Sequence, residues 1–273
     1  HADRFEDCSA LILVDGRPAI IFPASIMEGH VHSHGGLTFG GLVVRRAVRT
    51  SAVLDAGEAL LGKLHEWGAR KLTVRVLPPP FASHPSQDAE LAFLRRNFHV
   101  VRRDVSSIVR LGGPSSISKS KQRDILRAKK LGVTVEEIGL NLFYPLLADV
   151  LARRHDAVPV HSIAELQALQ RNFPDRILVR AARLDGAVVS GAVLFRYDEV
   201  WHTQYLASGE AGRRSNALDL VIASAMQEAA AAGAGWFSFG TSMDGEEINE
   251  GLLWQKESFG GRCLLQETIS GDL

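Results

Sequence analysis

The residues best suited to proton transfer lie in a strand-like segment at 200–207. His202 and Gln204 alternate there, and alternate residues of a strand project to the same face. Because a histidine titrates near neutral pH, His202 is a candidate general base and Gln204 a group that positions an acceptor. Tyr205 should project to the opposite side, as a candidate substrate-binding residue. The alternative for His202 is a hydrogen-bonded histidine in the protein core.

A polar loop at 208–215 joins this strand to a helix predicted over 216–232. The N–H groups and the dipole of a helix N-terminus favour anions, so we predict an anionic ligand at the loop. An ordinary surface loop is the alternative, and Asp219 fits a capping-box-like pair with Asn216. The candidate ligand-binding residues are Gly209, Gly212, Arg213, Arg214, Asn216 and Ala217.

Polar residues also gather after a buried strand predicted over 236–240. Ser242 lies just beyond its end, where ligands commonly bind, and a helix over 249–259 follows with Asn249 as a plausible N-cap. Lys256 either binds an anionic acceptor, with its stem on apolar surface, or forms an exposed ion pair. The candidate substrate-binding residues are Ser242, Asn249, Lys256 and Glu257.

Three histidines alternate at the start of a glycine-rich segment: His30, His32 and His34. Such spacing could ligate a metal ion. We instead expect His34 either to line a cleft, as a third catalytic candidate, or to be structural.

The charge of the chain is balanced overall and uneven locally. Lys and Arg number 31, as do Asp and Glu, which argues against a globally basic DNA-binding protein. Residues 95–130, however, hold eleven Lys and Arg but only two Asp. This segment is either a solvated basic surface or a surface for an anionic partner, such as a nucleotide, a phosphate-bearing substrate or tRNA.

The two cysteines, Cys8 and Cys263, form no disulfide framework, which suits a reducing cytoplasm. No apolar run approaches the roughly 20 residues that a membrane span requires. The first residues are polar, so we expect no signal peptide. Because the sequence begins with His1 rather than Met, we expect further residues before it.

Hydrophobic periodicity and turn residues predict alternating helices and strands. Gly112, Gly113 and Pro114 mark the clearest break, so we predict an N-terminal domain over 1–112 and a C-terminal domain over 113–273, the latter preceded by a basic helical segment. Helices are expected at 53–68, 88–96, 118–131, 142–153, 162–173, 216–232 and 249–259, and strands at 9–14, 17–26, 71–77, 99–111, 133–138, 177–184, 187–197, 200–207, 236–240 and 263–269.

Both halves follow the same order, which predicts a duplicated α+β unit with mixed sheets. Each has a hairpin about an Asp-Gly turn, then a strand, a loop, a helix that ends at Gly-Ala, and another strand. The two turns are Asp15-Gly16 and Asp185-Gly186.

This order resembles the GNAT acyltransferase fold, and two such units in tandem resemble the FemAB-like branch, the aminoacyl transferases of peptidoglycan synthesis. Several local strings are similar to bacterial members of that group. They are SHGGLTFGG at 33–41, HTQY at 202–205, ALD at 217–219, FGTS at 239–242, NEGL at 249–252 and QKESFG at 255–260.

The resemblance implies an acyltransferase with acetyl-CoA or a related acyl-CoA as co-substrate and no tightly bound cofactor or metal. The acceptor would be an amine or hydroxyl group, such as that of a nucleotide- or lipid-linked sugar of cell-surface polysaccharide. The loop at 208–217 departs from the usual GNAT signature, because no Gly or Ala lies two residues after Gly212; Arg213 and Arg214 could supply charge instead.

Two alternatives stay open. One is a Fem-type transferase that uses aminoacyl-tRNA, favoured by the basic segment but lacking a long helical-hairpin arm. The other is a non-catalytic binding protein on this scaffold, a reading favoured by the imperfect loop. We expect a cytoplasmic protein with a small-molecule or sugar-nucleotide acceptor, and leave a homodimer open.

Overall fold

The computed structural model describes residues 4–33, 35–82, 86–114 and 117–273. Contacts within the chain divide it into two compact units. Unit 1 comprises His1–Val105 and Leu264–Leu273, and unit 2 comprises Ser106–Cys263. The boundary thus lies before the expected one at 112, and the last strand returns to unit 1. The reason is that two long strands each contribute residues to both units.

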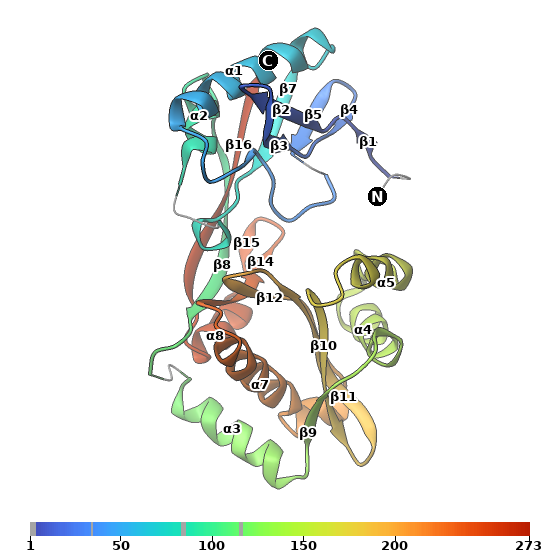
Figure 1. Ribbon diagram of the computed structural model, residues 1–273. Helices are drawn as coiled ribbons and strands as arrows, with labels where there is room; N and C mark the ends of the chain where they lie inside the picture. Colours follow the sequence, from blue (N-terminus) through green and yellow to red (C-terminus); the bar gives the residue numbers. More distant parts are fainter. Residues whose placement is uncertain (1–3, 34, 83–85, 115–116) are drawn as a thin grey trace. The chain divides into compact units, whose positions relative to one another are not determined.

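Unit 1 contains two helices and several short strands (Figure 1). The Asp15-Gly16 turn has positive φ at both residues, 51° and 72°, as a tight hairpin requires. The elements are β1 Glu6–Asp7, β2 Ala10–Val14, β3 Arg17–Phe22, β4 Ser25–Met27, β5 His30–Ser33, β6 Val43–Val44, α1 Thr50–Glu66, β7 Lys71–Arg75, the 3-10 turn Pro79–Phe81, α2 Asp88–Leu94, β8 His99–Arg110 and β16 Arg262–Asp272.

The main sheet of unit 1 mixes parallel and antiparallel pairs. Strand β4 pairs antiparallel with β1 and β5, β5 runs parallel to β7, and β7 pairs antiparallel with β16. Strands β2, β3 and β6 form a separate small sheet. Helices α1 and α2 contribute to the core, where Phe93 contacts Phe22 and Phe98 at ring-centroid distances of 6.3 and 5.6 Å.

Unit 2 has a longer sheet and more helices. Helix α5 begins at a full capping box, in which Ser162 and Glu165 exchange side-chain and backbone hydrogen bonds, as predicted. The elements are α3 Lys119–Lys130, β9 Thr134–Glu137, α4 Leu140–His155, α5 Ile163–Asn172, β10 Ile177–Leu184, β11 Ala187–Arg196, β12 Val200–Ser208, α6 Glu210–Arg214, α7 Ala217–Ala231, β13 Trp236–Thr241, β14 Met243–Asp244, β15 Glu247–Ile248 and α8 Glu250–Ser258.

Helices cover both faces of the unit 2 sheet (Figure 1). The strand order is β8-β13-β12-β11-β10-β9, antiparallel except for the pair β12–β13. One face packs with α3, α7 and α8 through a core that includes Trp201 and Phe259. The other packs with α4 and α5 through Phe143 and Leu166. Polar groups at the end of β12 therefore lie between two helical layers.

Nearly every predicted element is present within a few residues of its expected ends, and the mixed α+β class is confirmed. The similar order of the two halves also has a structural counterpart. In unit 1, β5 is followed by a loop, α1 and the parallel strand β7; in unit 2, β12 is followed by a loop, α7 and the parallel strand β13. In the described part of the chain, no helix combines the length and apolar character that a membrane crossing requires.

Candidate functional site

The parallel strands β12 and β13 are paired over only three positions. The pairs run from Val200 with Trp236 to His202 with Ser238. Beyond that point β12 continues along β11 and β13 along β8, so the two strands leave their mutual ladder. A parallel pair that opens in this way leaves backbone hydrogen-bonding groups of the two facing edges without ladder partners in each other.

His202 is the last paired residue of β12 and is buried, with 6% of its surface exposed. Its Nδ1 lies 3.0 Å from Ser238 Oγ. Burial and then the charge of Lys256 lower its pKa to about 4, so the imidazole is neutral at physiological pH. Gly240, with φ +68°, passes close to the ring: a Cβ there would lie 3.1 Å from His202 Cε1.

Lys256 of α8 lies close enough to His202 for its charge to act there, and its burial was not foreseen. It is 3% exposed, and its Nζ donates hydrogen bonds to the carbonyl oxygens of Gly240, at 2.9 Å, and Thr241. Burial lowers its pKa to about 8. Lys256 is therefore not the exposed ion-pairing residue of the second alternative, because its ammonium group is held at the end of β13; binding of an anionic acceptor stays a prediction.

A β-bulge changes the expected faces of β12. Val193 pairs with Tyr205 and Leu194 with Thr203, so Gln204 is an extra residue without a partner in the ladder. The bulge inverts the alternation after it. Tyr205 therefore lies on the face of His202, not on the opposite one as the strict alternation predicted.

Tyr205 belongs to a polar network that the sequence did not reveal. Its hydroxyl accepts a hydrogen bond from the His161 N–H at 3.1 Å and lies 2.7 Å from His161 Nδ1. Tyr144 donates to the His161 carbonyl oxygen at 3.1 Å. The Gln204 side chain also hydrogen-bonds Tyr205, whose pKa is raised mainly by burial. The bulge that places Tyr205 on this face has no clear sequence signal.

A cavity of about 480 Å³ lies at the end of β12, within unit 2. Leu206, Ala207 and Ser208 form one side, and helices α3, α4, α6, α7 and α8 complete it. Helix α7 begins after Asn216, which has φ 57° and no side-chain hydrogen bond to cap the helix. The remaining lining residues are Lys121, Asp124, Val150, Arg154, Gly212, Arg213, Leu218, Asp219, Leu252 and Gln255.

Three of the six candidates for the anionic ligand line this cavity: Gly212, Arg213 and Asn216. Arg213 donates to the Ser208 carbonyl oxygen at 2.8 Å. Arg214, by contrast, does not line the cavity and pairs with Glu210 at 2.6 Å. Gly209 and Ala217 flank the cavity in the chain but are not among its lining residues.

Gly212 has a packing reason to be glycine. A Cβ at this position would lie 2.2 Å from Ser190 Oγ and 2.3 Å from the Val189 carbonyl oxygen. The loop predicted at 208–215 folds into the short helix α6, which this close approach presses against β11. Ser215 Oγ donates to the Ala211 carbonyl oxygen at 2.8 Å within the same turn.

Asp219 accepts from Lys121, with Nζ 2.8 and 2.9 Å from its two oxygens, rather than completing a capping box. Burial raises the pKa of this carboxyl, and the lysine opposes that rise. Because the two residues are 98 positions apart, local spacing could not predict the pair. Sequence reasoning also missed Arg154 and Gln255, which line the cavity from α4 and α8.

The other three substrate-binding candidates lie in different environments. Ser242 is fully buried, and no partner for its Oγ is found in the described structure. Asn249 caps α8, with Oδ1 2.9 Å from the Leu252 N–H, and Glu257 is exposed on the same helix. None of the three lines the cavity of unit 2.

His34 lies outside the described residues. His30 and His32 stack in unit 1 with ring centroids 4.0 Å apart, and His30 Nε2 lies 2.8 Å from Thr73 Oγ1. Burial lowers the pKa of both imidazoles. The described part of the chain holds no group of three acidic, histidine or cysteine side chains arranged to bind a metal ion.

Comparison with known proteins relates this geometry to a family. Residues 117–247 match the family model of the acetyltransferase (GNAT) domain. The chain is similar in structure to FemX over 100% of its length and 89% of that chain, with a TM-score of 0.72 and 14% identity. L-PGS from Bacillus licheniformis is similar over 92% of this chain and 81% of that one, with a TM-score of 0.67 and 10% identity.

A tandem GNAT protein from the clavulanic acid biosynthesis pathway is similar over 98% of this chain and 85% of its own, with a TM-score of 0.53 and 12% identity. A comparison with curated proteins found no match. At such identities the similar structures show the fold alone. The matched domain contains β12, α7 and β13 of the candidate site, whereas α8 follows it in the chain. Residues 117–247 therefore form an acetyltransferase (GNAT) domain, and the chain as a whole has a fold similar to that of FemX.

Proposed function

We propose that this protein transfers an acyl group from a CoA-type donor, bound at the end of β12, to an amine or hydroxyl acceptor. The observation that carries the proposal is the cavity where β12 leads into the uncapped N-terminus of α7. Three cations line it, Lys121, Arg154 and Arg213, against two carboxylates. A phosphate-bearing donor is favoured at such a helix terminus by both the dipole and the side-chain charge.

The acyl carbon of such a donor would lie near the opening between β12 and β13. The extra residue Gln204 has no ladder partner, so its backbone N–H is suited to bind the developing oxyanion. The buried Lys256 ammonium supports the same negative charge from the end of β13.

His202 alone is poorly suited to remove the proton from the acceptor. A pKa of about 4 makes its imidazole a weak base at neutral pH. The neutral ring can still position a water or the acceptor by hydrogen bonding. We therefore propose His202 and Gln204 as residues that orient the reacting groups, and an amine or hydroxyl of a sugar nucleotide as the acceptor class to test first.

Calorimetric titration with acetyl-CoA tests the donor site directly. Arg213→Ala should weaken binding about tenfold, since a hydrogen bond to a charged group contributes about 1.5–3 kcal/mol. Arg214→Ala is the matched control, because that residue pairs with Glu210 outside the cavity, and it should change affinity less than twofold. Equal effects of the two variants would contradict the donor placement. Donor binding without turnover on any amine or hydroxyl acceptor would favour the non-catalytic alternative.

A second donor, aminoacyl-tRNA, is favoured by one specific observation. Helix α3 presents exposed cations, Lys119, Arg123 and Arg127, that pair with no acidic side chain of the described residues. A solvated cationic face of this kind suits a nucleic-acid backbone. Saturable tRNA binding together with no acetyl-CoA binding would support this donor over the first.

A further inference from the structure

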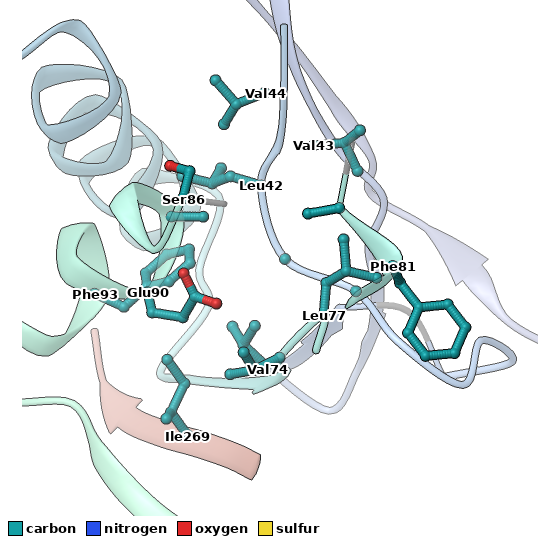
Figure 2. A pocket seen from close by; sticks show the side chains of 15 residues that line it. Leu42, Val43, Val44, Val74, Leu77, Phe81, Ser86, Glu90, Phe93 and Ile269 are labelled. Carbon is teal, nitrogen blue, oxygen red and sulfur yellow. The ribbon is translucent and has the colours of Figure 1, made fainter. Parts of the chain in front are cut away.

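Unit 1 contains a cavity of its own, of about 280 Å³ (Figure 2). It lies between the segment at 40–44, the end of β7, helix α2 and strand β16. Its walls are almost entirely apolar, with Leu42, Val74, Leu77, Phe93 and Ile269 among them. Ligand pockets in proteins usually span about 300–1,000 Å³, so this cavity suits a small group rather than a cofactor.

One charged side chain interrupts this apolar lining. Among the described residues that line the cavity, Glu90 is the only ionisable one and Ser86 provides the only hydroxyl group. In Figure 2 the Glu90 carboxylate projects into the cavity toward Val74 and Leu77. Within the part of the chain that the structure describes, Glu90 forms no ion pair with a Lys, Arg or His.

The surroundings of Glu90 are negative as well as apolar. Burial raises the pKa of its carboxyl, and the nearby charges of Asp88 and Glu267 raise it further, while its own backbone N–H opposes the rise. Glu90 is partly buried, and a carboxylate taken out of water normally has a cation or several hydrogen-bond donors around it. The missing component of this site is therefore a positive charge that can enter along with apolar surface.

We propose that this cavity binds a small primary amine, whose apolar body fills the space between β7 and α2 and whose ammonium group donates to Glu90. An anion would meet the Glu90 carboxylate, with the charges of Asp88 and Glu267 nearby, and a neutral apolar molecule would leave Glu90 desolvated without a partner. A zwitterionic amino acid is disfavoured by its own carboxylate. The site uses only residues of unit 1, so the inference does not rest on acyl transfer in unit 2.

Calorimetry at pH 8 with four matched probes tests this ligand class. Phenethylamine, 2-phenylethanol, 3-phenylpropionate and phenylalanine share a phenyl body and differ in charge. We expect phenethylamine to bind at least tenfold more tightly than the alcohol, with the carboxylate and the zwitterion weaker still. Equal binding of the amine and the carboxylate, or no binding of the amine, would overturn the proposal.

Variants then locate the bound amine. Glu90→Gln should abolish the preference for the amine over the alcohol while leaving alcohol binding within threefold. Asp88→Asn, on the same helix but outside the lining, is the matched control and should retain most of the preference. Ala89→Leu should fill the cavity and weaken both ligands. An amine preference that survives Glu90→Gln would place the amine elsewhere and refute the site.

Discussion

His202 and Ser238 form the last register pair between the parallel strands β12 and β13, and their side chains meet at the same point, with His202 Nδ1 3.0 Å from Ser238 Oγ. The hydrogen bond therefore spans the position at which the two strands separate. It fixes one ring nitrogen and with it the orientation of the imidazole. Because this histidine is buried in its neutral form, the stability of unit 2 depends on pH.

We expect His202 to make the protein less stable as the pH falls from about 6.5 toward 4. Its pKa is about 4 in the folded protein against a usual value of 6.5, so the unfolded state binds more protons in that window. The contribution of neutral His202 to the free energy of unfolding is complete above pH 6.5. It is lost on acidification, by up to about 3 kcal/mol. Urea unfolding from pH 4 to 8 should show a shallower acid loss in His202→Gln.

The control for this measurement is His65→Gln, at an exposed position of α1. It should leave the pH dependence of the parent unchanged. If His202→Gln loses stability on acidification as steeply as the parent, the histidine is not buried in its neutral form.

Lys256→Met should lower the turnover number by at least tenfold while changing donor affinity little. The substitution keeps the apolar stem but removes the charge next to His202 and the donors to Gly240 and Thr241. Because the pKa of Lys256 is about 8, the parent should lose activity above that pH as the ammonium deprotonates, and the variant should lose this alkaline limb. Steady-state kinetics from pH 6 to 10 measure both effects.

Two comparisons keep this test specific. Lys119→Met removes an exposed lysine from α3 and should leave the pH profile intact. Urea unfolding separates lost chemistry from lost folding, because the carbonyl oxygens of Gly240 and Thr241 lose the Lys256 donor, at a cost of about 1–3 kcal/mol each. A variant with a normal turnover number and an unchanged alkaline limb would remove Lys256 from the reaction.

Gly212→Ala should destabilise the protein by about 1–3 kcal/mol, because its Cβ would overlap Ser190 Oγ and the Val189 carbonyl oxygen. Gly62→Ala is the opposite case: that glycine lies within α1 with open space around it, and helix propensity predicts a gain of about 0.5–1 kcal/mol. Thermal unfolding of the pair measures both signs. Equal stability of Gly212→Ala and the parent would show that α6 does not pack tightly on β11.

Local patterns in this sequence predict the elements well because their periodicity and end signals agree. The capping box at Ser162 and the Asp185-Gly186 turn, for example, each specify a boundary within a few residues. The sites are less predictable because they depend on departures from regular geometry. One extra residue at Gln204 moves Tyr205 to the other face, and nothing in the alternating pattern indicates it.

Long-range pairs set a second limit. The Lys121–Asp219 ion pair joins helices whose local signals suggest a solvated cation and a capping carboxylate. Burial of Lys256 likewise follows from how α8 packs at the end of β13, although its stem was expected on apolar surface. The sequence shows which side chains are charged, but it does not show which partner each one has or how deeply each one is buried.

The exposed basic face of α3 gives the last prediction, which separates the two donors. Lys119→Gln, Arg123→Gln and Arg127→Gln together should leave acetyl-CoA affinity within twofold, because none of these residues lines the cavity of unit 2. They should weaken tRNA binding at least tenfold at low salt. Each lost phosphate contact should also reduce the slope of log K against log salt by about 0.7–0.9.

Filter binding of tRNA across a salt series measures this slope. Arg17→Gln, Arg46→Gln and Arg49→Gln remove three exposed cations from unit 1 and provide the matched control for net charge. If both triple variants reduce tRNA affinity equally, the effect is one of overall charge and α3 is not a binding face. If only the α3 variant does so while acetyl-CoA binding persists in both, the two ligands use different surfaces, and the donor is then the one whose addition supports turnover.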